Sequence, residues 1–374
     1  MSSTTTALFT PIKLGQYILK HRVVLSPMTR ARADDHGNPT EQVVEYYKQR
    51  ATPGGLLITE ATTISPFAGG YLHSPGVFTN DQIKAWKKVT DAVHEKGGII
   101  FIQLLHLGRT TFSSLLPDNQ SIVSASDIAI EGISQFGTPY EEPRPLEVDE
   151  IKSITQDFAQ AAKNAISAGF DGVEIHSGYG YLLDQFINTS SNKRTDQYGG
   201  SIENRARFTL EVVDAVGKAI GDDKTGIRLS PFSGFQDMKD DTPVATWSYI
   251  TEQIEKKHPS LAYLHFVEPR SNPAADSLEQ VEEGEEVETL DPFRALWSGP
   301  FISCGNYTYG ANMAFDRAEH SPNNLVAIGR AFIANPDLVE RFRNNWKLNP
   351  YNRATFHASG SEGYTDYSFY NATD

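Results

Sequence analysis

Residues 172–181 read GVEIHSGYGY, a short apolar run that ends in a histidine and a pair of tyrosines spaced by a glycine. Short, nearly continuous apolar runs are typical of parallel strands that are buried on both faces. Seven similar runs occur along the chain. Together, the eight predicted strands are residues 23–28, 56–61, 99–105, 172–177, 225–230, 263–267, 301–306 and 325–330.

Amphipathic stretches separate these strands. The predicted helices are residues 41–52, 81–96, 148–168, 201–220, a segment opened by Thr242 and Pro243, and residues 337–345. Eight strands that alternate with helices favour the α/β class and a closed (β/α)8 TIM barrel over a doubly wound sheet. A Rossmann sheet would carry G-x-G-x-x-G after its first strand, where this chain has MTRA at residues 28–31.

We expect residues 1–374 to form a single domain. A β-hairpin over residues 9–20 is predicted to close the bottom of the barrel. Long loops follow the third strand (109–145) and the sixth strand (268–291). The acidic run 279–288 in the second loop is interpreted as a solvated surface.

The composition is that of an ordinary globular protein, with 39% hydrophobic and 21% charged residues. A net charge of −14 argues against partners that are themselves anionic, such as nucleic acid or an acidic membrane surface. The single cysteine, Cys304, excludes an internal disulfide framework and a cysteine-based zinc site, and we expect no metal. Without a signal peptide or a membrane span, the sequence favours a cytoplasmic protein, either monomer or homodimer.

Active sites of such barrels lie at the carboxyl ends of the strands. Here those ends form a polar ring on an apolar barrel, as a ligand site requires. The ring comprises Thr29, Arg30, Glu60, Gln103, His106, His176, Tyr179, Tyr181, Arg228, Glu268, Asn306 and Arg330.

The ends of the last two strands predict a phosphate site. Gly305, Asn306 and Gly329 would let the backbone approach a phosphate closely, and Arg330 supplies a forked cation. The alternative is that the glycines serve tight turns and that Arg330 pairs with a surface carboxylate.

The end of the fourth strand predicts a substrate site. His176, Tyr179 and Tyr181 place three hydrogen-bond donors together, which suits a carbonyl oxygen on which negative charge develops. Their alternative role is structural packing. No P-loop, H-E-x-x-H or G-x-S-x-G motif is present, so kinase, zinc-protease and hydrolase functions lose their main support.

The chain resembles the Old Yellow Enzyme family of NADH:flavin oxidoreductases and ene-reductases, in a fungal-type form, over nearly its whole length. The matching stretches are SPMTR at 26–30, LITEA at 57–61, QLLHLGR at 103–109, residues 172–186, SNKRTD at 191–196, GGSIENR at 199–205 and GRAFIANPDL at 329–338. The resemblance implies non-covalent FMN, an NADPH hydride donor and an α,β-unsaturated aldehyde or ketone as acceptor.

By the same resemblance, Pro27, Met28, Thr29, Ala61 and Gln103 line the flavin ring. Arg228 places positive charge beside its N1 and O2 atoms, while Gly305, Asn306, Gly329 and Arg330 cradle the phosphate. The implied reaction is ping-pong, since NADPH and the acceptor share one pocket. His176 and Tyr179 hold the acceptor's carbonyl, and Tyr181 protonates its α-carbon. Further substrate contacts are expected from Tyr71, Leu105, Phe235, Gln236, Phe356 and His357.

Two positions depart from the family pattern. Tyr179 stands where asparagine or histidine is usual, and Leu105 where tryptophan is common, which puts substrate identity in question. Two other functions stay open. One is a pathway-specific reductase or isomerase of an unsaturated aldehyde in fungal alkaloid metabolism, although the presence of Tyr181 favours net reduction. The other is a flavin-binding protein without turnover.

Overall fold

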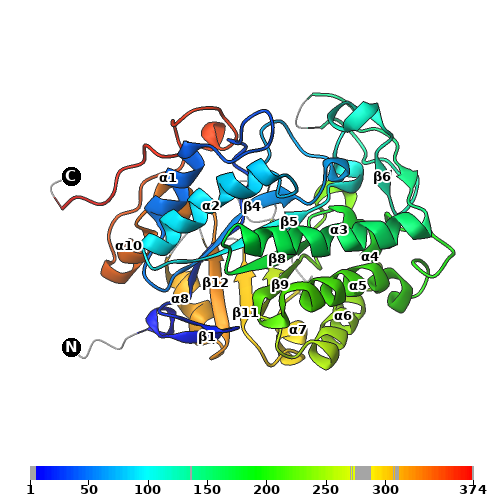
Figure 1. The fold of residues 1–374 in the computed structure, drawn as a ribbon. Coiled ribbons are helices and arrows are strands. Elements are labelled where there is room, and N and C mark those ends of the chain that lie inside the picture. The colour runs from blue at the N-terminus through cyan, green and yellow to red at the C-terminus, as the bar shows by residue number, and fades with distance from the viewer. Residues whose placement is uncertain are drawn as a thin grey trace.

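Eight strands close into a barrel in the computed structural model, and each pairs in parallel with both neighbours (Figure 1). The structure describes residues 6–134, 137–269, 271, 273, 288–305, 307 and 311–372. The strands, in their order around the barrel, are β10 (Tyr263–Val267), β11 (Phe301–Cys304), β12 (Asn324–Ile328), β3 (Val23–Leu25), β4 (Leu56–Thr63), β5 (Ile99–Leu105), β8 (Gly172–Ser177) and β9 (Thr225–Leu229). The predicted barrel is confirmed, as is each predicted strand to within a few residues.

Helices surround the barrel. The longer ones are α1 (Glu41–Arg50), α2 (Asn80–Glu95), α3 (Val148–Ser167), α5 (Ile202–Ile220), α6 (Pro243–Lys257), α8 (Ala311–Glu319) and α10 (Leu338–Asn344). The shorter ones, α4 (Leu182–Ile187), α7 (Asp291–Ala295) and α9 (Arg330–Ala334), follow strand ends. Short 3-10 turns are η1 (Ala7–Phe9), η2 (Pro66–Ala68), η3 (Gly108–Thr110), η4 (Ser113–Leu115), η5 (Pro117–Asn119), η6 (Asp222–Lys224), η7 (Phe235–Asp237) and η9 (Arg353–Thr355).

Local chemistry fixes the ends of these elements. At the start of α2, Thr79 and Gln82 form a capping box, in which each side chain accepts a hydrogen bond from the other residue's backbone N–H. The first barrel strand ends at Leu25, three residues earlier than predicted. Pro27 has no N–H to donate to a neighbouring strand, so the ladder cannot extend through it.

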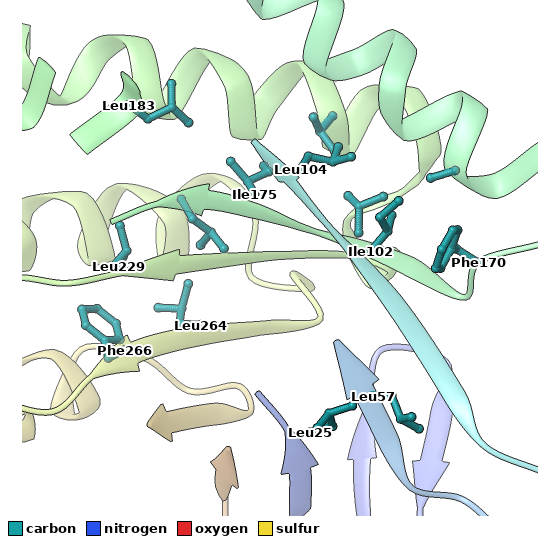
Figure 2. Packing of buried hydrophobic residues seen from close by; sticks show 14 of the residues in the cluster. Leu25, Leu57, Ile102, Leu104, Phe170, Ile175, Leu183, Leu229, Leu264 and Phe266 are labelled. Carbon is teal, nitrogen blue, oxygen red and sulfur yellow. The ribbon is translucent and has the colours of Figure 1, made fainter. Parts of the chain in front are cut away.

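Most of the buried apolar surface lies between the strands and the surrounding helices. Figure 2 shows outward-facing strand residues such as Leu104, Ile175 and Phe266 within this layer. A second, smaller core fills the barrel, with Phe101 and Ile302 among its residues. Strands buried on both faces explain why the sequence shows continuous apolar runs rather than alternation.

The predicted hairpin is confirmed as β1 (Ile12–Leu14) and β2 (Tyr17–Leu19), paired antiparallel. Its Leu14 and Leu19 are fully buried and belong to the core inside the barrel. The hairpin therefore closes the end of the barrel opposite the carboxyl ends of the strands.

Of the two predicted long loops, only the one after β5 lies mostly within the described residues. The loop after β5 is ordered around a short two-stranded pairing of β6 (Val123–Ser124) with β7 (Arg144–Pro145). Most of the loop after β10 lies outside the described residues, including the acidic run except for its last residue, Glu288.

Candidate active site

A cavity of about 1000 Å³ opens at the carboxyl ends of the barrel strands. Seventeen of the predicted site residues line it. They are Pro27, Met28, Thr29, Ala61, Tyr71, Gln103, His176, Tyr179, Tyr181, Arg228, Phe235, Gln236, Gly305, Gly329, Arg330, Phe356 and His357. Asn306 lies outside the described residues. Leu105 does not line the cavity.

His176 and Tyr181 form an aromatic pair on one wall. Their ring centroids are 4.8 Å apart and their planes meet at 69°. Burial, together with the positive charge of Arg228, holds the pKa of His176 well below its usual range. The imidazole is therefore neutral, with one nitrogen able to donate and one able to accept. Its Nδ1 atom is buried and has no hydrogen-bond partner among the described residues.

Tyr181 is held in place by its neighbours. It donates a hydrogen bond to Tyr71, which itself is hydrogen-bonded to Thr110. Leu105 belongs with Ala61 and Leu107 to a small apolar cluster against which Tyr71 and Tyr181 pack, and it does not line the cavity. Burial, then the proximity of Tyr71, raises the pKa of Tyr181 well above 10, so the phenol keeps its proton at neutral pH.

Tyr179 sits in a left-handed backbone conformation with φ of +54°, which is uncommon for a bulky residue. Ser230 holds this conformation, because its Oγ accepts the Tyr179 N–H at 2.7 Å. The ring lies 5.0 Å from the guanidinium of Arg228 and meets Phe235 edge-on. Burial, followed by the charge of nearby Cys304, raises the pKa of Tyr179 to about 12. The phenol thus keeps its proton at neutral pH, and its side chain is hydrogen-bonded to Ser271.

Arg228 extends from β9 into the cavity with 6% of its surface exposed. Burial alone would lower its pKa, but Cys304, Tyr179 and Glu174 raise it above the usual value, so the charge is permanent. Its Nη2 atom donates to Cys304 Sγ at 3.2 Å, while its Nε atom is buried without a partner among the described residues. A buried donor of this kind calls for an acceptor from a ligand.

At the predicted phosphate corner, Ser271 and Met28 lie where side chains on Gly305 and Gly329 would begin. Gly305 adopts φ of +112°, and a Cβ atom there would lie 2.6 Å from Ser271 Oγ. A Cβ atom on Gly329 would lie 2.8 Å from Met28 Sδ. Arg330 and Arg353 both donate to the carbonyl of Pro273, at 3.2 and 2.9 Å, so two cations converge on this corner.

Several polar residues at the ends of the strands have structural rather than ligand contacts. Glu60 accepts hydrogen bonds from the backbone N–H groups of Arg30 and Ala31, both at 3.0 Å, and so fixes the turn that carries Thr29. Arg30 binds the carbonyl of Phe356 at 3.1 Å and thereby holds the C-terminal segment over the cavity. Neither Arg30 nor Glu60 lines the cavity, and the same is true of His106 and Glu268.

The sequence reasoning missed two further lining residues of chemical interest, Cys304 and Arg353. Cys304 was expected to form neither a disulfide nor a zinc site, and its position just before Gly305 was a usable signal for a cavity residue. Arg353 belongs to a segment far from any predicted strand, and the only signal for it was the expected contact of Phe356 and His357 in the same segment. Within the described part of the chain, no cluster of three or more metal-ligating side chains occurs. None of the described helices has the length and apolar character needed to cross a membrane.

Comparisons with known proteins agree with this geometry. Residues 7–349 match the family described as NADH:flavin oxidoreductase / NADH oxidase. The chain is 48% identical to 12-oxophytodienoate reductase 1 of Oryza sativa subsp. japonica, over 98% of this chain and 94% of that protein. It is 45% identical to flavin oxidoreductase hxnT of Emericella nidulans, over 97% of each. Morphinone reductase has a similar structure, with a TM-score of 0.89 and 43% identity over 100% of this chain and 99% of that one. A structure of morphinone reductase in complex with tetrahydroNAD gives a TM-score of 0.87 at 44% identity, over 98% of both chains.

A closed barrel whose mouth combines a buried arginine, a glycine-lined cationic corner and a neutral histidine–tyrosine pair defines a flavin-dependent oxidoreductase. The chain belongs to the NADH:flavin oxidoreductase / NADH oxidase family, and its predicted membership of the Old Yellow Enzyme family is confirmed.

Proposed function

We propose that residues 1–374 form one domain that binds FMN without covalent attachment and reduces the carbon–carbon double bond of α,β-unsaturated carbonyl compounds with hydride from NADPH. The two half-reactions follow one another in a single pocket. The observation that carries this proposal is the pair of buried nitrogens without described partners, Arg228 Nε and His176 Nδ1, in one cavity beside Tyr181.

The residues present fit FMN. Gly305 and Gly329 carry no side chain into this corner, where Ser271 and Met28 lie close to the backbone, and Arg330 and Arg353 supply charge opposite to that of a phosphate. Thr29, Ala61 and Gln103 line the cavity together with Pro27 and Met28, as contacts for the flavin ring would require. When bound there, FMN supplies a two-electron carrier that takes hydride from a nicotinamide and delivers it to an activated alkene.

Arg228 has the charge and position to stabilise an anionic ring edge. It is buried, permanently charged and turned toward the cavity. In a low-dielectric site, a fixed charge of this kind acts far more strongly than in water. We therefore assign it to the pyrimidine edge of the flavin, where reduction places negative charge.

His176 and Tyr179 are assigned to the carbonyl oxygen of the acceptor, where each donates one hydrogen bond. Neutral donors can stabilise the growing negative charge on that oxygen without first losing a proton. Tyr181 is assigned as the acid that protonates the α-carbon. Its raised pKa guarantees that the proton is present, and Tyr71 and Leu105 hold the ring in place.

Apolar and aromatic side chains around the cavity favour acceptors with a sizeable hydrophobic substituent. Phe112, Ile133, Tyr140 and Phe235 line the wall together with Leu72, and Ile133 and Leu72 remain largely exposed at the surface. Burial of these apolar side chains against an apolar group of the substrate removes them from water, which is favourable.

The proposal is tested by following the flavin spectrum. Purified protein should be yellow, lose its colour anaerobically on addition of NADPH, and regain it with 2-cyclohexenone. Bleaching without recovery would favour a flavin-binding protein without turnover. Recovery accompanied by a shifted double bond instead of a saturated product would favour an isomerase.

A further inference from the structure

Cys304, the only cysteine of the chain, ends β11 with 3% of its surface exposed. It lines the cavity, and its Sγ atom accepts a hydrogen bond from Arg228 Nη2 at 3.2 Å. The preceding residue, Ser303, points the other way and hydrogen-bonds Tyr307 at 2.7 Å. The register of β11 therefore turns the sulfur inward, against the guanidinium, and the sulfur is also hydrogen-bonded to His265.

Three buried polar side chains, Gln103, Glu174 and His265, are hydrogen-bonded to one another near the contact between Cys304 and Arg228. Gln103 Nε2 donates to one oxygen of Glu174 at 2.7 Å, and the other oxygen lies 2.7 Å from Nδ1 of His265. Strand pairing puts Arg228 directly opposite both His176 and His265, so these groups occupy one level of the barrel. Although burial raises the pKa of the Cys304 thiol, the charges of Arg228 and His265 lower it below its usual value.

The nitrogens of the Arg228 guanidinium differ in their hydrogen-bond partners. Its Nη2 atom is bound to sulfur, and its Nε atom has no partner among the described residues. A sulfur that gains negative character beside Arg228 would offset part of the arginine's charge. Whatever anionic edge faces Arg228 then experiences a weaker field.

We propose that Cys304 is a positioning residue for Arg228, and that its sulfur lowers the reduction potential of the bound flavin by offsetting the arginine's charge. This inference rests on the proposed function, because it requires FMN in the cavity. It needs no chemistry at the sulfur itself, which only accepts a hydrogen bond.

The test is the midpoint potential of bound FMN, measured anaerobically against a reference dye. Cys304→Ala should raise the potential, because Arg228 would then act on the flavin without a competing acceptor. We expect about a tenfold rise in the ratio of reduced to oxidised FMN at a given potential, which corresponds to about 30 mV for a two-electron couple. Cys304→Ser should fall between the two, since a hydroxyl accepts a hydrogen bond but stays neutral.

The control is Ile302→Val, two residues earlier on the same strand, in the core inside the barrel. It should leave the potential at the wild-type value. If the alanine variant fails to fold, the serine variant supplies the same comparison. FMN bound at an unchanged or lowered potential in the Cys304 variants would overturn this inference alone. A wild-type protein that takes up no FMN would overturn the proposed function as well.

Discussion

The imidazole of His176 and the phenol of Tyr181 lie 4.8 Å apart, with their ring planes at 69° to each other. The first residue is the last but one of β8 and the second caps α4, with Gly178 and Gly180 in the turn between them. One turn of the chain thus carries a neutral hydrogen-bond donor and a neutral acid to the same wall. This arrangement divides the two tasks of alkene reduction between two side chains, one for the carbonyl oxygen and one for the α-carbon.

Tyr181→Phe should therefore slow one half of the reaction selectively. Removal of a general acid typically costs about 100-fold or more in rate. We expect this loss in the oxidation of reduced flavin by 2-cyclohexenone, and less than about threefold in its reduction by NADPH. Rapid-mixing absorbance at the flavin band measures each half separately. Tyr17→Phe, at the closed end of the barrel, is the control. Equal slowing of both halves would remove the role of Tyr181 as proton donor.

The pH dependence of the same half-reaction should be flat around neutrality. The pKa of His176 is held well below 6.5 and that of Tyr181 well above 10. Neither group then changes charge between about pH 6 and 9. Single-turnover rates with the enone across this range give the test. Burial raises the pKa of Asp184, which accepts the Gly180 N–H, to about 7. A titration centred near pH 6.5 that persists in Asp184→Asn would show that His176 is not in the buried, neutral state described here.

Arg330→Ala should weaken FMN binding. A hydrogen bond to a charged group contributes about 1.5–3 kcal/mol, so the dissociation constant should rise about 10- to 150-fold. The loss should be larger in a double variant with Arg353→Ala, because both side chains reach the same corner. Quenching of flavin fluorescence on titration of the apoprotein measures the affinity. Arg343→Ala, on the exposed face of α10 near Glu340, should bind FMN as the wild type does.

Acid should destabilise the fold through His106. Burial lowers its pKa from 6.5 to about 3, so between these values only the unfolded chain binds the proton. The free energy of unfolding must therefore fall as the pH falls through this window, by about 1.4 kcal/mol per pH unit for one histidine. His106→Gln should make that slope shallower by this amount in urea titrations at pH 4 to 6, with FMN saturating.

The matched control is His94→Gln. Its hydrogen bond with Asp171, the largest influence, raises the pKa of His94, so its stabilising contribution is fully present below pH 6.5 and constant across the same window. This variant should lower the free energy of unfolding but keep the wild-type slope. A shallower slope in His94→Gln, or an unchanged one in His106→Gln, would contradict the assignment.

The barrel and much of its mouth could be predicted because both follow from strand periodicity. Once eight buried strands are placed, the residues at or just after the end of each strand fall at one end of the barrel, as Arg228 and Gly329 do. Polarity alone could not tell a ligand contact from a structural one. Glu60 accepts hydrogen bonds from two backbone N–H groups of a turn about thirty residues earlier. Every residue except proline has such a group, so the sequence does not show which ones a side chain will bind.

The direction in which a side chain points at the end of a strand could not be predicted from the sequence either. Leu105 shares its strand with Gln103, yet it belongs to the cluster against which Tyr71 and Tyr181 pack and does not line the cavity. Arg353 reaches the phosphate corner from the C-terminal segment, which Arg30 and Arg32 fold back over the cavity. Such an approach is a tertiary contact between distant parts of the chain.

Tyr179→Asn tests how far the unusual tyrosine shapes the pocket. The substitution should not destabilise the fold, because asparagine tolerates a φ of +54° better than tyrosine does, and the hydrogen bond to Ser230 uses only the backbone. The smaller side chain removes the ring that lies beside Arg228 and Phe235. A phenol such as p-hydroxybenzaldehyde should then bind more tightly, seen as a stronger long-wavelength band at equal ligand concentration. If the wild type and the variant titrate alike, the Tyr179 ring does not limit access to the flavin, and substrate preference must be set by other walls of the cavity.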